Sequence, residues 1–541
     1  MIRWLRKRAP LVTVLFFLLL TLAGLLTSAD YGLPCDEPAE QDILRENLYE
    51  YATRLLGSQS DAARYYQANG VQLISQSIER DHGESAYYLA APILQLQADA
   101  PDTMTVLWHA YTWLWFMAGV IALYRLMRQL GLNRFLACAT ALFLYLSPRF
   151  FAEGHYNNKD VVLLSLTLCT LASGLRFQKK PSLPSALLFS LFGALAANTK
   201  IIGALPWGLM GLAALWSLAA RRELTRKNII AGISAILAFG VFYLLLTPAA
   251  WVAPRAFTQY LLGNAANFTR WSGLVLFNGV YYNPARTLPL PRTYLPVMIA
   301  LTTPIPYLLF AVVGQVRALF LMARRDSLRP TLIALTLLWL IPFAYVVLAR
   351  PVLYNSWRHF YFLYAPIAVL AGLGLQTAWQ ALGRSRVRRS LGAVALAAIF
   401  GWQAVGITLN HPYQYAYYNV LARDVPERYE LDYWDVSTLD AMRRLCVEAQ
   451  RDQTLPLVLG ARDYMSHFGI EHGIAVLPAA LRDAMTVTDD PDAPYLFYNT
   501  TYEKIYGIDP PEGYRALFSI SGYGNVLCTV YERNAEAPAT R

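Results

Sequence analysis

The chain has 541 residues, of which 56% are hydrophobic and only 15% are charged, and its mean hydropathy is +0.32. A soluble domain is typically about 25% charged, and soluble cores of normal size have no room for this many apolar residues. The composition also excludes a disordered chain, collagen, a coiled coil and a disulfide-rich secreted scaffold. A polytopic membrane protein remains, and the meaning of the formal net charge of +10 then depends on where the cations lie.

Apolar bands separated by charged segments follow one another along the first 409 residues. Their lengths match the roughly 20 residues that a helix needs to cross a bilayer. The eleven bands lie at 11–28, 104–124, 135–148, 161–175, 183–199, 201–219, 229–248, 294–323, 331–349, 361–380 and 391–409. The bands near 140 and 190 are short, so the number of spans can differ from eleven by one or two.

The first band, Leu11 to Ser28, carries no charge and follows a basic start of the chain. A cleavable signal peptide begins in the same way. However, the apolar region is longer than in signal peptides, and no clear small-x-small cleavage pattern follows it. We therefore expect a retained transmembrane helix.

The distribution of charge predicts the orientation of the spans. Six segments between alternate bands hold 21 Lys and Arg but only two acidic residues, and they are 1–10, 125–134, 176–181, 221–228, 324–329 and 383–390. The segment 29–103 on the other side has 13 acidic and four basic residues, and the tail 410–541 has 19 and 11. Cytoplasmic loops are enriched in Lys and Arg. We expect a cytoplasmic N-terminus and a C-terminus on the opposite side, and no binding of nucleic acid.

The composition divides the chain into a transmembrane domain, 1–409, and a soluble C-terminal domain, 410–541. In the tail, short apolar runs alternate with turn residues and with one charged helix near Ser437–Arg451, which is typical of a small α/β or α+β domain. Cys446 and Cys528 share this domain, where oxidation is permitted. They form either a disulfide or two buried free thiols.

Polar residues crowd the outer ends of the predicted spans. Asp36 and Glu37 directly follow the first span, although two acids there also suit the start of an amphipathic surface helix. The link 147–160 is unusually rich in polar side chains, although a solvated turn has a similar composition. Its candidates are Arg149, Glu153, His155, Lys159 and Asp160.

Cations also occur on the outer side, against the positive-inside bias. Lys200 and the neighbouring pair Arg358 and His359 stand at span ends close to the bilayer, where a buried cation suits an anionic ligand. Four arginines of the loop 249–293 are equally well explained by contact with lipid phosphates.

Carboxylates facing cations at a membrane boundary suit the transfer of a group from a membrane-anchored phosphate. The cations would stabilise the departing phosphate, and a carboxylate would take the proton of the attacking hydroxyl. A transporter or lipid flippase is the alternative, and a non-enzymatic scaffold is a third. A transporter tends to place its polar residues near mid-span at interrupted helices, whereas here they cluster at one surface.

Several of these segments together resemble a known family. The segments are the acidic pair at 36–37, the loop 148–160, Trp357-Arg-His-Phe-Tyr-Phe, Tyr294-Leu-Pro, His411-Pro-Tyr-Gln-Tyr-Ala-Tyr-Tyr-Asn and Tyr429-Glu-Leu-Asp-Tyr-Trp. They are similar to the bacterial protein-mannosyltransferase-like glycosyltransferases, which are related to the protein O-mannosyltransferases and to the aminoarabinose transferase of lipid A. The resemblance covers nearly all of residues 1–440.

The resemblance implies a mostly α, GT-C-like membrane protein of about eleven transmembrane helices, with a large first outer loop and a small C-terminal domain. It also implies inverting transfer from a polyprenyl-phosphate-linked sugar, at the periplasmic face of a bacterial inner membrane. Membrane lipids would surround the protein, and the acceptor would be a protein, a lipid or a glycan. The tail beyond about 440 carries no motif with an assigned role.

Carried over by residue, Asp36 matches the acid of the first loop, which acts as base or metal ligand, and Glu37 is its partner. Asp160 matches the acid of the second outer loop. The positions near the donor phosphate are Lys159, Arg358 and His359, to which the location of Lys200 adds a fourth; Arg149 and Glu153 are further candidates. The family often has a hydroxylated or aromatic residue at position 155, so His155 is interpreted as structural. Asp36 and Asp160 could together hold Mg²⁺ or Mn²⁺ or act without metal, and the cofactor is otherwise unknown.

Overall fold

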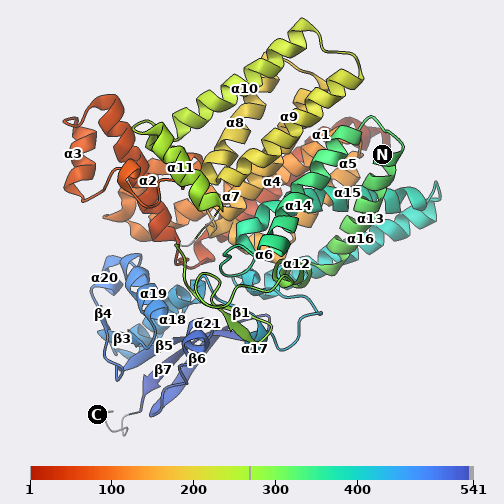
Figure 1. The fold of residues 1–541 in the computed structure, drawn as a ribbon. Helices are drawn as coiled ribbons and strands as arrows, with labels where there is room; N and C mark the ends of the chain where they lie inside the picture. The colour runs from red at the N-terminus through yellow and green to blue at the C-terminus, as the bar shows by residue number, and fades with distance from the viewer. Residues whose placement is uncertain (1, 267, 269, 535–541) are drawn as a thin grey trace.

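The structure is a computed structural model, which describes residues 2–266, 268 and 270–534, with side chains from residue 10 onward. A large helical bundle occupies one part of the molecule, and a small sheet domain lies at one end of it (Figure 1). The bundle helices are α1 Ile2–Thr27, α4 Pro101–Gln129, α5 Arg134–Tyr145, α6 Pro148–Tyr156, α7 Asp160–Lys179, α8 Leu183–Thr199, α9 Ala204–Ala220, α10 Arg226–Leu246, α12 Tyr294–Thr302, α13 Ile305–Ala323, α14 Arg329–Ala349, α15 Tyr364–Ala381 and α16 Arg386–Leu409.

Every apolar band of the sequence is helical, and the band 294–323 is divided between α12 and α13. In the described part of the chain, nine helices are long and apolar enough to span a membrane, and α5 with α6 makes a tenth if this pair, bent by 69°, is one span. The eleventh band is α8, an apolar helix of 17 residues. The two bands whose length left the count open are therefore a bent pair and a short helix. The protein is a multi-pass membrane protein, mostly helical, as predicted.

Helix α7 lies at the centre of the bundle. Its most apolar 18-residue stretch is 94% buried. The corresponding stretches of α10 and α13 are only 11% and 17% buried and present their side chains to the surroundings.

Small residues let α13 and α15 touch through their backbones. A Cβ atom at Gly374 would lie 1.9 Å from the carbonyl oxygen of Phe310. Small residues allow this kind of close approach between membrane helices.

Two long loops lie at the same end of the bundle as the sheet domain. The first contains α2 Glu37–Tyr51, α3 Asp61–Ala68 and the 3₁₀ helix η4 Ser85–Gln97. Helix α2 begins with Glu37 and Pro38 and buries Leu44, so the amphipathic helix expected after Asp36 is present. The second loop contains α11 Pro254–Ala266 and the hairpin of β1 Val275–Phe277 and β2 Val280–Tyr282.

The tail forms a five-stranded mixed sheet with helices, as its turn-rich composition predicted. The strand order is β4-β3-β5-β7-β6, in which β3 is parallel to β4 and β5, and β7 is antiparallel to β5 and β6. The elements are α18 Val436–Asp452, β3 Leu457–Ala461, α19 Tyr464–Ala475, α20 Ala479–Arg482, β4 Met485–Thr488, β5 Tyr495–Asn499, α21 Thr500–Tyr506, β6 Tyr514–Gly522 and β7 Asn525–Arg533. Cys446 and Cys528 are buried free thiols, so the disulfide alternative is wrong.

The segment 410–435 joins the tail to the bundle and packs against the start of the first loop. The Cys35 N–H donates to the carbonyl oxygen of Trp434 at 2.9 Å, and His411 Nε2 lies 2.8 Å from Asp30 Oδ2. The acidic first loop and the tail are therefore on the same side of the bundle, as the charge distribution predicted. We call this side, formed by residues 28–103, 249–266, 270–293, 350–363 and 410–533, the loop face.

Candidate active site

Asp36 and Arg358 form an ion pair on the loop face. Asp36 stands directly before α2, and Arg358 begins the short helix η7 Arg358–Leu363. Arg358 Nη1 lies 2.5 Å from Asp36 Oδ2; the Asp36 side chain is 44% exposed, whereas that of Arg358 is only 8% exposed. The pair joins the two positions that the sequence singled out as the candidate base and the candidate phosphate ligand.

Two aromatic rings hold the Arg358 guanidinium in place. Its carbon lies 4.4 Å from the centroid of the Tyr354 ring and 4.3 Å from that of Trp434. Arginine stacks well on aromatic faces and stays charged when buried. Arg358 Nε is buried and makes no hydrogen bond to any described residue. The guanidinium is thus fixed in position.

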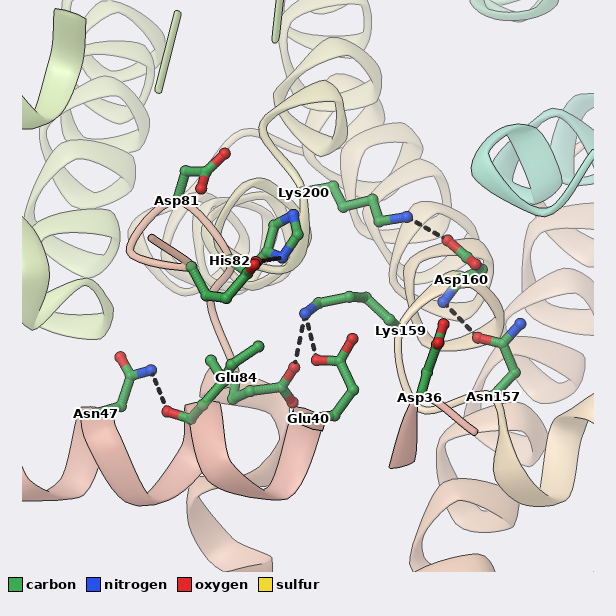
Figure 2. A network of polar contacts seen from close by, with 12 residues as sticks. Asp36, Glu40, Asn47, Asp81, His82, Glu84, Asn157, Lys159, Asp160 and Lys200 are labelled. Carbon is green, nitrogen blue, oxygen red and sulfur yellow. Dashed lines mark hydrogen bonds and ion pairs between the residues drawn. The ribbon is translucent and has the colours of Figure 1, made fainter. Parts of the chain in front are cut away.

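A second ion pair joins α7 to the end of α8. Lys200 Nζ lies 2.5 Å from Asp160 Oδ1, and the Asn157 side chain accepts a hydrogen bond of 2.8 Å from the Asp160 N–H (Figure 2). Tyr354 connects the two pairs electrostatically. Burial raises the pKa of Tyr354, Arg358 opposes this, and the carboxylates of Asp160 and Asp36 raise it further.

His359 also lies beside Tyr354. The two ring centroids are 3.5 Å apart in an edge-to-face arrangement, and His359 Nε2 is buried without a hydrogen-bond partner in the described part of the chain. The structure thus brings Asp36, Asp160, Lys200 and Arg358 together with His359 at one place.

Lys159 points to a different set of carboxylates. Its ammonium contacts Glu40 and lies 3.1 Å from Glu84 Oε1 (Figure 2). Burial alone would lower the pKa of Lys159, but the two carboxylates raise it. Burial alone would raise the pKa of Glu40, but Lys159 lowers it to about 2, whereas burial raises the pKa of Glu84. Two carboxylates hold this ammonium, whereas Arg358 and Lys200 each pair with one, and the role of Lys159 at the donor phosphate stays a prediction.

Glu37 turns into the protein although its neighbour Asp36 is half exposed. Its side chain is fully buried, with Oε2 3.0 Å from His109 Nε2 and Oε1 accepting from Gln41 Nε2 at 3.1 Å. This arrangement suits a residue that anchors the start of α2 and thereby positions Asp36. It does not suit direct contact with a substrate.

Arg149 and Glu153 lie inside the protein, on α6. Arg149 Nη1 donates to Ser356 Oγ at 2.8 Å. Glu153 Oε1 accepts from the hydroxyls of Tyr361 and Tyr433, at 2.7 and 3.1 Å. Arg149 thus links α6 to the segment just before η7, and Glu153 links α6 to η7 and to the segment 410–435. This geometry favours a structural role for both side chains.

His155 is a packing residue, in agreement with the structural interpretation of its position. Its ring is stacked between Tyr31 and Trp113, with centroid distances of 4.1 and 4.3 Å. Its ring nitrogens lie 3.0 and 3.1 Å from the carbonyl oxygens of Phe151 and Gly24.

The predicted metal ligands, Asp36 and Asp160, each hold a cationic side chain. Within the described ranges, no three His, Cys, Asp or Glu side chains gather into a group that could hold a metal ion. A divalent cation at these two carboxylates would have to displace Arg358 or Lys200. The donor set therefore does not fit a bound metal.

Trp434 and the turn that carries it had no role predicted from the sequence. Asp432 accepts hydrogen bonds from Tyr415 Oη at 2.6 Å and from Val436 N at 3.1 Å, and Asn499 Nδ2 donates to Asp435 Oδ1 at 2.8 Å. The end of β5 thus holds the turn that presses Trp434 onto Arg358. The run of acidic and aromatic residues at 429–434 was the only signal for it.

Fold and site together define a multi-pass membrane protein with carboxylate–cation pairs gathered on one face of its helical bundle. The family model of dolichyl-phosphate-mannose-protein mannosyltransferase matches residues 94–259, from η4 to α11. This match confirms the resemblance seen in the sequence and connects the chain to glycosyltransferases. The matched segment contains Asp160 and Lys200 but not Asp36 or Arg358.

Other comparisons give only distant similarity. No curated protein matches the chain. The crystal structure of ArnT from Cupriavidus metallidurans bound to undecaprenyl phosphate is 13% identical, with a TM-score of 0.46, over 96% of this chain and 97% of that one. In its apo state ArnT gives a TM-score of 0.47 at 13% identity, covering 96% and 98%. The apo oligosaccharyltransferase of Archaeoglobus fulgidus gives 0.44 at 12% identity, covering 89% and 69%.

Proposed function

We propose that the protein is a glycosyltransferase that moves a sugar from a polyprenyl-phosphate donor to an acceptor hydroxyl, with inversion. The reaction would take place at the periplasmic face of a bacterial inner membrane. The observation that carries the proposal is the pair of Asp36 and Arg358, in which a half-exposed carboxylate touches a guanidinium held between two aromatic rings. The match of residues 94–259 to a mannosyltransferase family supports the same reaction class.

Arg358 is the residue best suited to bind the donor phosphate. A guanidinium offers planar, paired N–H donors that match phosphate oxygens. Its stacking on Tyr354 and Trp434 fixes the direction of these donors before the donor lipid arrives. Donors fixed in this way stabilise the charge that develops on a leaving group without reorganising during the reaction.

Asp36 is the residue best suited to take the acceptor's proton. In an inverting displacement, the acceptor oxygen forms a bond to the anomeric carbon while the bond from that carbon to the phosphate oxygen breaks. The bonding pair leaves with the phosphate, which is stable as an anion and needs no acid. The hydroxyl proton passes to Asp36. One carboxylate is therefore enough, and its exposure lets it meet an acceptor that comes from outside the membrane.

Asp160 and Lys200 support this centre. The N-terminal end of α7 and the Asn157 side chain hold Asp160, and Asp160 in turn holds the Lys200 ammonium beside the site. Lys200 adds positive charge on the side of the phosphate, and Asp160 limits the net charge of the site before the donor binds.

Donor binding and transfer can be measured with the purified protein in lipid nanodiscs, using radiolabelled polyprenyl-phosphate sugars. We expect Arg358→Ala to weaken donor binding, and Arg358→Lys to restore only part of it because lysine lacks the planar fork. Arg423, an exposed arginine of the same face, provides the matched control as Arg423→Ala. Unchanged donor affinity in Arg358→Ala would remove Arg358 from the phosphate site.

The same preparation separates a transferase from a transporter or flippase. Vesicles that carry a labelled polyprenyl-phosphate sugar on one leaflet report movement of the lipid, whereas a labelled acceptor reports transfer. Lipid movement without any transferred sugar would refute the proposed reaction. A scaffold would give neither signal.

A further inference from the structure

A short helix of the tail domain, α21, holds the backbone beside the candidate active site. Thr501 Oγ1 accepts a hydrogen bond from Asp432 N at 3.0 Å, and Tyr502 Oη donates to the carbonyl oxygen of Tyr433 at 2.6 Å. The next residue along the chain is Trp434, which covers the guanidinium of the candidate site. Helix α21 therefore holds both residues that precede Trp434.

Trp434 connects this backbone to both members of the ion pair. Its ring centroid lies 4.3 Å from the guanidinium carbon of Arg358, and its carbonyl oxygen accepts from Cys35 N at 2.9 Å. Cys35 directly precedes Asp36. The tail domain thus reaches the proposed base and the proposed phosphate ligand through three consecutive residues, 432–434.

The same helix carries a buried carboxyl group. Glu503 is fully buried, and neither of its oxygens receives a hydrogen bond from another described residue in its ionised form. Its hydrogen-bonding neighbour is the carboxyl group of Asp463, which caps α19 by accepting from Ser466 N at 2.9 Å. An ionised carboxylate has no proton to donate. Glu503 and Asp463 can therefore hydrogen-bond to each other only by sharing a proton.

The cations near this carboxyl pair are turned to other partners. Arg462 acts on Glu503 electrostatically, but its side chain is exposed and its Nη1 donates to the carbonyl oxygen of Asp509 at 2.9 Å. Lys504 Nζ lies 2.6 Å from Glu427 Oε1. The other titratable groups that face the pair carry no positive charge, and they are Tyr498 on β5, Cys528 and Tyr531 on β7, Tyr506 on α21 and Asp435 before α18.

The carboxyl pair keeps its proton at neutral pH. Burial, and then the charge of Asp463, raise the pKa of Glu503 from 4.5 to about 8 against the opposing effect of Arg462. Burial also raises the pKa of Asp463. The contribution of Glu503 to stability is therefore complete below about pH 4.5 and is lost as the pH rises through about 8. Above that pH, two adjacent buried carboxylates repel each other.

We propose that α21 is a proton-dependent clamp on the active site. While Glu503 and Asp463 share a proton, α21 holds the 432–434 backbone, and Trp434 keeps Arg358 in place. When the proton passes to solvent, the two carboxylates separate and α21 releases this backbone. Arg358 then loses one of its two aromatic neighbours, and its N–H groups are no longer fixed in the direction of the phosphate. The effect on the donor rests on the proposed function, whereas the release of the backbone does not.

Release of the backbone is measured by hydrogen exchange of the amides of 432–438 and 501–506, in the full-length protein in nanodiscs without donor. Variant and wild type are compared at the same pH, so the effect of pH on intrinsic exchange cancels. With a pKa of about 8 in the docked helix and 4.5 in the released one, docking weakens about 30-fold between pH 6.5 and pH 9. The protection of the wild type relative to Glu503→Gln should fall by up to this factor, because glutamine can donate to Asp463 at every pH.

Two further variants make this measurement specific. Glu512→Gln changes an exposed carboxylate of the same domain and should behave as the wild type does. Asp463→Asn removes the like charge while keeping a good cap for α19, so the loss of protection should move to lower pH. A wild type that keeps the same protection relative to Glu503→Gln at both pH values would overturn the clamp, and so would an Asp463→Asn variant that changes at the same pH as the wild type.

Donor affinity over the same pH range tests whether the clamp acts on the active site. The polyprenyl-phosphate sugar is a phosphodiester, so its own charge does not change in this range. We expect the wild type to lose affinity relative to Glu503→Gln between pH 6.5 and pH 9, by at most the same factor. This comparison cancels the titration of other groups, among them Glu430 with a pKa of about 7.

The two measurements distinguish failure of the clamp from failure of the proposed function. Donor affinities that change in parallel in the wild type and in Glu503→Gln would overturn the clamp and leave the transferase proposal intact. If the donor binds the wild type at no pH while the difference in hydrogen exchange persists, the proposed function fails and the proton-dependent release of the backbone stands.

Discussion

Replacing Asp36 by Asn tests the proposed mechanism most directly. The substitution keeps the size of the side chain but removes its charge and its ability to take a proton. A positioned general base typically contributes about 10²–10⁴-fold to a rate, so turnover should fall by this amount. The ion pair with Arg358 is a much smaller contribution. Because the Asp36 side chain is 44% exposed, the pair is worth at most about 1 kcal/mol, so its loss should change donor affinity by no more than about fivefold.

The two effects are separated by measuring donor binding and single-turnover sugar transfer with the same nanodisc preparation. Glu37→Gln is the matched control, since it makes the same chemical change one residue further along the chain. Glu37 is buried against His109 and Gln41, so its loss should reduce turnover less than the loss of Asp36. Transfer by Asp36→Asn at a near-normal rate would show that the base lies elsewhere, and Asp160 would then be the next residue to test.

Three further predictions concern stability and topology. Lys159→Met leaves two buried carboxylates without their cation, which costs about 3–5 kcal/mol; a clearly lower midpoint of thermal unfolding is expected, and an unchanged midpoint would contradict the pairing. Burial raises the pKa of Glu430 from 4.5 to about 7, so its contribution to stability is complete below about pH 4.5 and is lost as the pH rises through about 7. Glu430→Gln should therefore unfold at a higher temperature than the wild type at pH 8 but not at pH 5, and equal differences at both pH values would refute this. Reporter insertions near residues 70 and 480 should both report the non-cytoplasmic side, and opposite sides would refute the predicted orientation.

The sequence by itself determined the class of the protein and the course of its chain. All eleven apolar bands are helical, and the acidic first loop lies beside the acidic tail. The apolar runs of the tail became β3, β5 and β7, and its charged segment became α18. These features follow from the composition of short windows, because a span needs enough consecutive apolar residues and a loop is sorted by its own charge.

Only the tertiary structure decided which polar residues meet. Asp36 pairs with Arg358, 322 positions away, and Trp434 from the tail covers the same guanidinium. Lys159 and Asp160 are adjacent in sequence but have different partners. Lys159 pairs with Glu40 and Glu84, whereas Asp160 pairs with Lys200. Successive helical residues point about 100° apart, so the direction of each side chain depends on how its helix is rotated and packed. Rotation and packing are set by contacts between distant segments, and no local pattern in the sequence records them.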